Sequence, residues 1–479
     1  MGSRLRGNDG LYICVKLIFV AYMCVNSGNS LFGIKSDAYI AIIRKTPTAT
    51  DPLLELQQPF TSNGLSSERR RVAPHAREVM ELKQELKRLR LGRNEERRLR
   101  GGHIWIYSNE VDNAVTPLKS FTPGEIVLVE AHGGKPMGVA YVNPHSLICA
   151  RLIGQGDERL DTPLLVRRFK QALALREGLF DVPFYRFVFG ESDLLPGLVV
   201  DRFGAHLVVQ LNTAGMDAAR DAIIEALIQV LQPQSIVLRN DSSMRVLENL
   251  EKEVVVAYGQ PPDHVELIEN GVKFLAPLHD GQKTGWFYDQ RPNRAWLKKY
   301  VVGKRVLDVF SYIGGFGVQA AAFGAREAWC VDRSAAALDL VKKSAELNGV
   351  AERMHCIEGD AFDVLKDLKE RDEKFDVIIV DPPAFIKRKK DITEGINAYR
   401  RINEAAMQLL GTEGYLLSGS CSMHLQREEL VDILRGASRH LDRHLQIIEE
   451  GMQGPDHPVH PAIPETRYIK AFMSRIYTA

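Results

Sequence analysis

The segment KRVLDVFSYIGGFG, residues 304–317, decides the fold of the C-terminal part of this chain. Its apolar start, from Lys304 to Phe310, predicts a strand, and a helix is expected from about Val318. Between them, Gly314 and Gly315 let the backbone turn tightly and approach a ligand where side chains would collide. A strand, a glycine-rich turn and a helix in this order predict the first unit of a doubly wound parallel sheet.

The next two predicted strands end in acidic residues. AWCVD ends at Asp332, which follows Asp308 by 24 positions, where a carboxylate can accept hydrogen bonds from both hydroxyls of a ribose. MHCIEGD ends at Asp360, with Ala361 and Phe362 after it. A polar residue followed by apolar ones suits the edge and the face of an adenine, so these two strand ends predict an adenosine site.

The fourth strand, FDVIIVDPPAF, places Asp381 and Pro382 at the carboxyl end of the sheet, beside the switch point where ligands bind in open α/β sheets. With the preceding strands, this pattern resembles the class I S-adenosylmethionine-dependent methyltransferases. It differs from the NAD enzymes, whose GxGxxG turn holds a pyrophosphate that the Asp308 carboxylate would repel. A carboxylate beside a methionine ammonium is favourable, so S-adenosylmethionine is the expected cofactor, with Asp308 and Phe310 among its ligands.

The polar segment HDGQKTGWFYDQRPNR, residues 279–294, precedes this domain core. It sits where such enzymes carry the element that closes over the methionine end of the cofactor. Lys283 and Phe287 are therefore candidate cofactor ligands, together with Thr284 and Arg291. The alternative is a loop and a helix cap with ordinary core aromatics, since polar residues are also common in exposed loops.

The fifth strand and its loop, GYLLSGSCSMH, place Cys421 on a turn of small residues at the same edge of the sheet. Methylation of cytosine at C5 needs a nucleophile that adds to C6 first, and a thiolate serves this purpose. Asp381 is placed to protonate or hydrogen-bond N3 during that addition. The alternative is a buried structural cysteine, the role that we assign to Cys330 and Cys356, which lie inside apolar strands.

Segments spread over much of the chain resemble those of the bacterial large-subunit ribosomal RNA methyltransferase I family, which makes 5-methylcytosine. They are LPGLVVDRFG (195–204), GQKTGWFYDQRPNR (281–294), DPPAFIKRKKD (381–391) and SCSMH (420–424). The resemblance covers about residues 80–479. It implies an N-terminal β-barrel PUA-like domain, a middle α+β domain and a Rossmann-like, seven-stranded catalytic domain with Cys421 as nucleophile. Large-subunit ribosomal RNA is the implied partner, and we expect a homodimer.

Two features leave the chemistry open. Many RNA cytosine methyltransferases outside this group carry a second cysteine where this chain has Pro383, so the base that removes the C5 proton is unassigned. The basic run from Lys387 to Lys390 can hold the RNA backbone beside an extruded base, or it is a solvated surface loop. A guanine or exocyclic-amine methyltransferase and a catalytically lapsed RNA-binding assembly factor are the rival functions.

The sequence pattern also predicts the domain boundaries. Short β-rich runs from Ile104 to Leu152 predict a small barrel, and helices are expected over Thr162–Glu177 and Met216–Gln232. A helix with a strongly basic face is expected within Arg69–Arg100, where Leu82, Leu86 and Leu89 share helical spacing; it contacts RNA phosphates or is simply solvated. We expect a poorly ordered extension over 1–78, the PUA-like domain over 79–156, the middle domain over 157–275 and the methyltransferase domain over 276–479.

The composition of the chain bears on its partners and on its cellular location. The 479 residues contain 62 Lys and Arg against 61 Asp and Glu, so net charge indicates no partner. The six cysteines show no CxxC pair, which argues against a disulfide framework or a metal site and favours a reducing cytoplasm. An apolar run from Leu11 to Val25 has the outline of a secretory signal, but Lys16 interrupts it and it is too short for a membrane span, so we expect no membrane association.

Overall fold

The computed structural model describes residues 86–156 and 158–478, and the extension predicted over 1–78 lies outside these ranges. The first sheet has five strands in the order β1-β3-β4-β5-β2. An isolated bridge between Leu91 and Val111 connects the chain after β1 to the chain after β2, as a barrel-like closure requires. The elements are β1 (Arg88–Arg90), α3 (Arg97–Arg100), β2 (Trp105–Tyr107), β3 (Ile126–Glu130), β4 (Pro136–Val142) and β5 (Ile148–Gly154).

The helix expected from the spacing of Leu82, Leu86 and Leu89 is wrong at Leu86 and Leu89, the two that the structure describes, although Arg97–Arg100 form the short basic helix α3. Leu89 lies on β1, opposite Val129 of β3, and is fully buried in the core of this sheet. Strand pairing and burial therefore override the helical spacing of the leucines, because tertiary contacts outweigh local propensity. Arg90 makes two hydrogen bonds to the buried carboxylate of Glu130, at 3.0 and 2.6 Å, so part of the basic charge is neutralised within the sheet.

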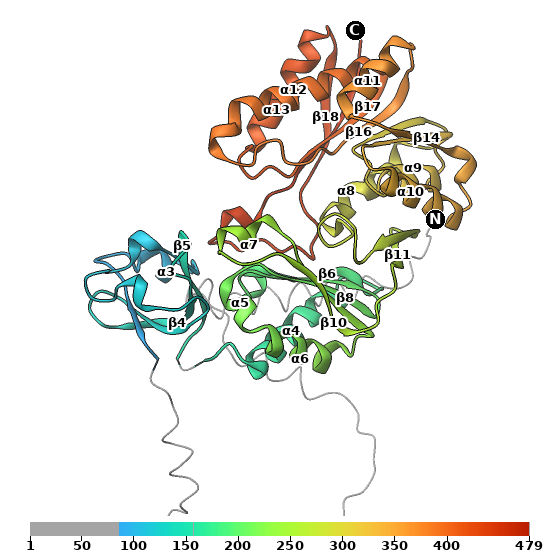
Figure 1. The fold of residues 1–479 in the computed structure, drawn as a ribbon. Coiled ribbons are helices and arrows are strands. Elements are labelled where there is room, and N and C mark those ends of the chain that lie inside the picture. The colour runs from blue at the N-terminus through green and yellow to red at the C-terminus, as the bar shows by residue number, and fades with distance from the viewer. Residues whose placement is uncertain (1–85, 157, 479) are drawn as a thin grey trace, which may run out of the picture. The chain divides into compact units, whose positions relative to one another are not determined.

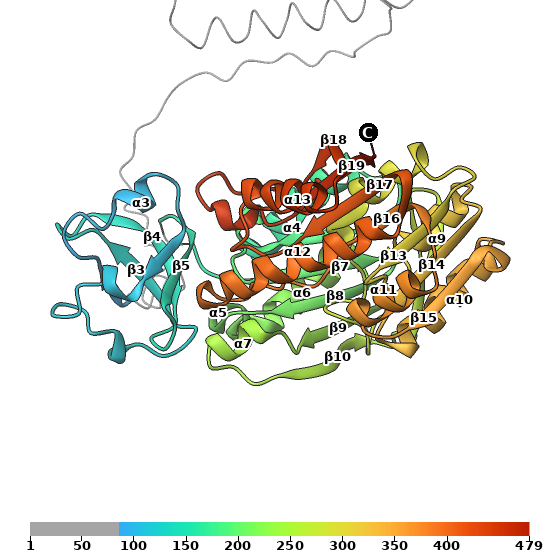
Figure 2. The same ribbon diagram turned by 90° about the horizontal axis from the view of Figure 1, so that it is seen from above.

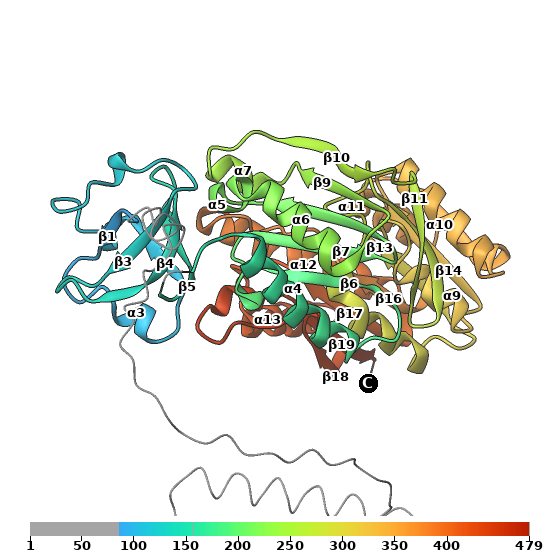
Figure 3. The same cartoon turned by 90° about the horizontal axis from the view of Figure 1, so that it is seen from below.

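A second five-stranded sheet follows in the order β10-β9-β8-β7-β6. Its strands are β6 (Phe184–Phe189), β7 (Leu198–Phe203), β8 (His206–Leu211), β9 (Ser235–Asn240) and β10 (Glu253–Gly259). Its helices are α4 (Thr162–Glu177), α5 (Ala214–Ala218), α6 (Arg220–Leu231) and α7 (Ser243–Leu247). Figure 3 shows α4 and α6 side by side over this sheet, where Phe169 and Leu227 are buried in one core with Val209. The helix predicted over 216–232 is broken at Ala219, which leaves helical geometry.

The third sheet has seven strands in the order β15-β14-β13-β16-β17-β19-β18, after a hairpin of β11 (His264–Glu269) and β12 (Val272–Pro277). Its strands are β13 (Arg305–Val309), β14 (Glu327–Asp332), β15 (Met354–Glu358), β16 (Phe375–Val380), β17 (Leu410–Ser420), β18 (His444–Gly451) and β19 (Lys470–Tyr477). The pairs from β15 to β17 are parallel, and β19 is antiparallel to both of its neighbours. The predicted seven-stranded, doubly wound sheet is confirmed.

Helices cover both faces of this sheet because its strands are apolar on both faces. Leu307 and Val309 of β13 are buried with residues of α11, α12 and α13, whereas Val306 is buried with residues of α9. Figures 1 and 2 show α11, α12 and α13 as one group, with α9 and α10 beside β14. The helices are α8 (Arg291–Ala295), α9 (Gly317–Ala322), α10 (Ala335–Leu347), α11 (Ala361–Glu370), α12 (Ile392–Gln408) and α13 (Arg427–His440).

The switch point of the sheet lies between β13 and β16, since the chain leaves β13 toward β14 on one side and returns to β16 on the other. Ligands bind at the carboxyl ends of strands at such a point. The same edge receives the ends of β14, β15 and β17. Across residues 86–156 and 158–478, no helix has both the length and the apolar character that a membrane crossing requires.

Candidate active site

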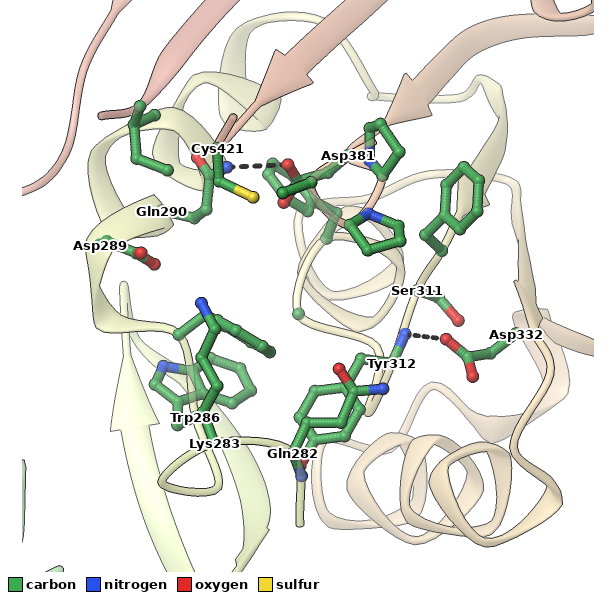
Figure 4. A pocket seen from close by; sticks show the side chains of 18 of the residues that line it. Gln282, Lys283, Trp286, Asp289, Gln290, Ser311, Tyr312, Asp332, Asp381 and Cys421 are labelled. Atoms are coloured by element: carbon green, nitrogen blue, oxygen red, sulfur yellow. Dashed lines mark hydrogen bonds between the residues drawn. The ribbon is translucent and has the colours of Figure 1, made fainter. Parts of the chain in front are cut away.

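A cavity of about 540 Å³ lies at this edge of the sheet. Ten of the residues that the sequence analysis expected to bind the cofactor or to act on the substrate line it: Lys283, Phe287, Phe310, Gly315, Asp332, Asp360, Phe362, Asp381, Pro382 and Cys421. Figure 4 shows Cys421, Lys283 and Asp289 directed into one part of it, with Asp332 and Tyr312 at another. The cavity therefore joins the residues expected to bind the cofactor to those expected to act on the substrate.

Five further residues expected to bind the cofactor do not line the cavity: Thr284, Arg291, Asp308, Gly314 and Ala361. Asp308 is buried behind the glycine turn, where its Oδ2 accepts a hydrogen bond from the backbone N–H of Gly317 at 2.8 Å. Burial raises its pKa to about 7, and nearby carboxyls add to the effect. Gly314 has a φ of +81°, and a Cβ there would lie 2.8 Å from Val318. Asp308 and Gly314 therefore shape the glycine-rich turn without lining the cavity.

Asp332 is oriented by two backbone donors at the end of β14. Its Oδ2 accepts from the N–H of Tyr312 and its Oδ1 from that of Ser334, both at 2.9 Å. Phe310 and Tyr312 adopt positive φ angles of 68° and 49°, which side chains other than glycine rarely take. Such backbone conformations cluster where a ligand must be approached. The turn is thereby shaped to present Asp332 at the cavity.

Asp360 caps α11, because its Oδ1 accepts from the N–H of Phe362 at 3.0 Å. Phe362, rather than the buried Ala361, faces the cavity. The ring of Phe385 lies 6.4 Å from that of Phe362 and 6.3 Å from that of Phe310, so three aromatic side chains form one wall. An apolar aromatic wall beside carboxylates is a suitable environment for an adenine.

The turn that carries Cys421 is fixed by buried hydroxyl groups on both sides of the thiol. Ser420 and Ser422 are fully buried, and the Ser420 hydroxyl accepts from the N–H of Ser422 at 3.1 Å. It also donates to the hydroxyl of Tyr399 at 2.8 Å, which is 2.8 Å from the Ser422 hydroxyl in turn. The N–H of Ile386 donates to that serine as well, at 3.2 Å, so the loop after β16 and the thiol turn are held together.

The groups around Cys421 have opposing effects on the pKa of its thiol. Burial raises the pKa of the thiol, and the carboxyls of Asp381 and Asp289 raise it further, whereas the ammonium groups of Lys283 and Lys470 lower it. The net effect raises the pKa of the Cys421 thiol, so it is the positive charge of the two lysines that favours the reactive thiolate. Cys330, by contrast, is fully buried on β14 and Cys149 on β5.

Asp381 follows β16 and receives a hydrogen bond at 3.0 Å from the Nε2 of Gln290, in the 3-10 helix η5 (Tyr288–Gln290). Burial raises the pKa of Asp381 to about 7, and the charge of Asp289 adds to this, while Arg294 and Lys283 oppose it. A carboxyl that titrates near neutral pH is suited to proton transfer at that pH.

Asp289 and Tyr468 line the cavity and were missed in the sequence, although Asp289 stands in the quoted segment 279–294. The Tyr468 hydroxyl donates to Oδ2 of Asp289 at 2.6 Å, whereas Oδ1 is buried without a hydrogen-bond partner. Burial alone would raise the pKa of Asp289, but His457, Lys283 and this hydrogen bond hold it below its usual value. A buried anionic oxygen without a partner fits the ammonium of a methionine, so the cavity suits S-adenosylmethionine at both ends.

Comparisons with known proteins agree with the fold and with the expected cofactor. Residues 243–462 match the S-adenosylmethionine-dependent methyltransferase family, and residues 89–155 match the PUA-like domain. A solved methyltransferase structure complexed with SAH is similar with a TM-score of 0.70 at 21% identity, covering 81% of this chain and 100% of that one. Another S-adenosylmethionine-dependent methyltransferase structure, from Streptococcus mutans, is similar with a TM-score of 0.69, with the same coverage and identity. At this identity the likeness concerns the fold.

Sheet, cavity and family matches together define an S-adenosylmethionine-dependent methyltransferase with a PUA-like domain. The ribosomal RNA large subunit methyltransferase I of Erwinia tasmaniensis is 38% identical over 395 residues, which is 81% of this chain and 99% of that protein. Those of Klebsiella pneumoniae strain 342 and Tolumonas auensis are 37% and 38% identical, over 81% and 80% of this chain and 98% of each relative. The chain belongs to the ribosomal RNA large subunit methyltransferase I family.

Proposed function

We propose that this protein methylates C5 of a cytosine in large-subunit ribosomal RNA, with Cys421 as the nucleophile and Asp381 as the acid that assists it. The observation that carries the proposal is that the Cys421 thiol and the Asp381 carboxyl open on the same cavity as Asp332 and Asp360. The names of the relatives support the RNA substrate, since all three are ribosomal RNA large subunit methyltransferases.

The chemistry follows from the two groups. The Cys421 thiolate adds to C6 of the cytosine, and a proton from Asp381 at N3 compensates the electron density that this addition creates. S-adenosylmethionine, when bound, supplies an electrophilic methyl group to C5. Methyl transfer leaves S-adenosylhomocysteine. A base then takes the C5 proton, the electron pair of that bond forms the C5–C6 double bond, and the bond between C6 and sulfur breaks to return the thiolate. The N3 proton returns to the Asp381 carboxylate, which restores both the aromatic ring and the acid. The base that takes this proton is left unassigned.

In this proposal the other parts of the chain bind RNA. The PUA-like region, 79–156, and the middle region, 157–275, accompany the catalytic region, 276–479. The exposed side chains from Lys387 to Lys390 follow the Asp381 motif directly and are available to phosphates. A free catalytic thiol is consistent with a reducing cytoplasm. The homodimer expected from the sequence stays a prediction.

A covalent trap tests the mechanism. In RNA that carries 5-fluorocytidine, addition and methyl transfer leave fluorine at C5, so no proton can be lost and the protein stays linked to the RNA. We expect a stable adduct with the wild type and with Cys356→Ala, a matched control, and none with Cys421→Ala. Mass spectrometry of nucleosides should place the transferred label in 5-methylcytidine. Label in guanosine, or methyl transfer that survives in Cys421→Ala, overturns the proposal in favour of an amine methyltransferase. If calorimetry shows no binding of S-adenosylmethionine, the protein is instead a catalytically lapsed enzyme.

A further inference from the structure

Lys470, a residue that the proposed mechanism does not use, reaches the turn that carries Cys421. It is the first residue of β19 and pairs in register with Ser420, the last residue of β17. Its Nζ donates a hydrogen bond to the carbonyl oxygen of Ser422 at 2.6 Å. The ammonium therefore crosses from one strand to the next and holds the backbone directly after the thiol.

Six titratable groups interact electrostatically with Cys421. They are two ammonium groups, two carboxyls and two phenols: Lys283, Lys470, Asp289, Asp381, Tyr399 and Tyr468. Burial and the carboxyls favour the thiol, so the thiolate depends on the two ammonium groups.

The two lysines differ in their position. Lys283 is exposed and lines the main cavity, where a bound cofactor or substrate would lie near its charge. Lys470 does not line that cavity but a second one, of about 320 Å³. Burial lowers its pKa to about 8, and Cys421 opposes this decrease, so a thiolate and the Lys470 ammonium stabilise one another.

We propose that Lys470 is a positioning residue for Cys421: its ammonium fixes the turn through the Ser422 carbonyl and supplies a positive charge that favours the thiolate. The inference rests on the proposed function, which needs Cys421 as nucleophile. On activation the proton leaves the sulfur for solvent, the sulfur keeps the electron pair that later bonds to C6, and Lys470 keeps its own proton.

Alkylation of the full chain by iodoacetamide as a function of pH tests the proposal, because only the thiolate reacts. The Cys421 peptide is quantified by mass spectrometry. Lys470→Met should raise the apparent pKa of Cys421 and slow its alkylation at pH 7, where the Lys470 ammonium is mostly protonated, by about 3- to 10-fold, the change expected for about half to one pKa unit. Lys470→Arg should stay within about 2-fold of the wild type, because the charge is kept.

Lys374→Met is the matched control. Lys374 also donates to a backbone carbonyl, that of Gln408 at 3.2 Å, but it is exposed and is not among the residues that line the cavity. It should leave the Cys421 profile unchanged. If Lys470→Met does not fold, Lys470→Gln keeps a donor for the Ser422 carbonyl without the charge and should show the same slowing.

An alkylation profile in a folded Lys470→Met or Lys470→Gln variant that equals the wild type overturns the proposal, and so does an equal change in Lys374→Met. This experiment needs neither RNA nor cofactor. An adduct with 5-fluorocytidine RNA together with an unchanged alkylation profile therefore removes the role of Lys470 alone. A slowed profile without any RNA adduct removes the proposed function and leaves the effect of Lys470 on the thiol.

Discussion

The side-chain amide of Gln290 donates from Nε2 to Oδ1 of Asp381 at 3.0 Å. The amide has a fixed orientation, because its Oε1 accepts from Nδ2 of the fully buried Asn293 at 2.6 Å. The segment before the catalytic sheet thus presents a donor to the carboxyl that follows β16. This bond favours the ionised form of Asp381, against the burial that favours the protonated form.

Gln290→Leu should therefore raise the pKa of Asp381 further, by up to about one unit. Because the proposed role of Asp381 is that of an acid, the decline of activity at high pH should move to higher pH, while the rate falls about 10-fold through lost orientation. The pH dependence of kcat/KM for labelled methyl transfer measures both effects. Gln229→Leu, which removes an exposed bond to Glu225, is the control. A decline that moves to lower pH contradicts this role of Gln290.

Gly419 leaves room for Asp381. A Cβ at this buried glycine would lie 2.7 Å from Oδ1 of Asp381, so Gly419→Ala should displace the carboxyl and lower activity at least about 10-fold. Overpacking should also reduce the free energy of unfolding by about 1–3 kcal/mol. Gly436→Ala is the contrasting variant, because nothing lies near its Cβ on α13, and alanine should stabilise that helix by up to about 1 kcal/mol. Assays of methyl transfer and of urea unfolding compare the two variants. Wild-type activity in Gly419→Ala would contradict this prediction.

Burial of Asp308 and Asp381 makes stability depend on pH. The pKa of each is raised to about 7, whereas an aspartate in the unfolded chain has a pKa of about 4. Between about pH 4 and 7 the folded state therefore binds more protons than the unfolded state. The contribution of these groups is fully present below about pH 4 and is lost as the pH rises through about 7.

Asp308→Asn should flatten this decline, because an amide oxygen still accepts from Gly317 but carries no charge. Urea unfolding at pH 5 and pH 8 measures the difference in free energy of unfolding for each protein. Asp339→Asn, at an exposed position on α10, should keep the wild-type difference. A difference that is as large in Asp308→Asn as in the wild type refutes this explanation.

Tyr399→Phe removes the hydroxyl that joins Ser420 to Ser422. Two buried hydroxyls then lose a partner, which should cost about 1–3 kcal/mol of stability. Adduct formation with 5-fluorocytidine RNA should slow, because the thiol turn is less fixed. Tyr477→Phe, near the far end of β19, should change neither property. The idea fails if Tyr399→Phe forms the adduct at the wild-type rate.

Asp289→Asn should weaken cofactor binding, since the amide still accepts from the Tyr468 hydroxyl but no longer attracts an ammonium. We expect the Kd for S-adenosylmethionine in calorimetry to rise by about 10-fold or more, as for the loss of a partly desolvated ion pair. Asp363→Asn, exposed on α11, provides the comparison. Wild-type affinity in Asp289→Asn would place the ammonium elsewhere in the cavity.

The sequence alone determined the type of sheet and the edge where its motifs meet. Buried parallel strands need apolar residues on both faces, and Val306 and Leu307 supply them within one short strand. Because each such strand ends at the same edge, Asp332, Asp360, Asp381 and Cys421 could be expected near one another from their places in the pattern alone.

Only the tertiary structure decided which side chains complete the site. Leu89 follows a helical spacing yet pairs as a strand, because Val129 lies far along the chain and no local pattern records it. Tyr399 of α12 and Lys470 of β19 reach the Cys421 turn through hydrogen bonds to its two serines. Tyr468, just before β19, reaches Asp289 through its hydroxyl. A periodic pattern encodes which face of an element is buried, whereas a hydrogen bond between distant residues depends on distances that exist only once the chain is folded.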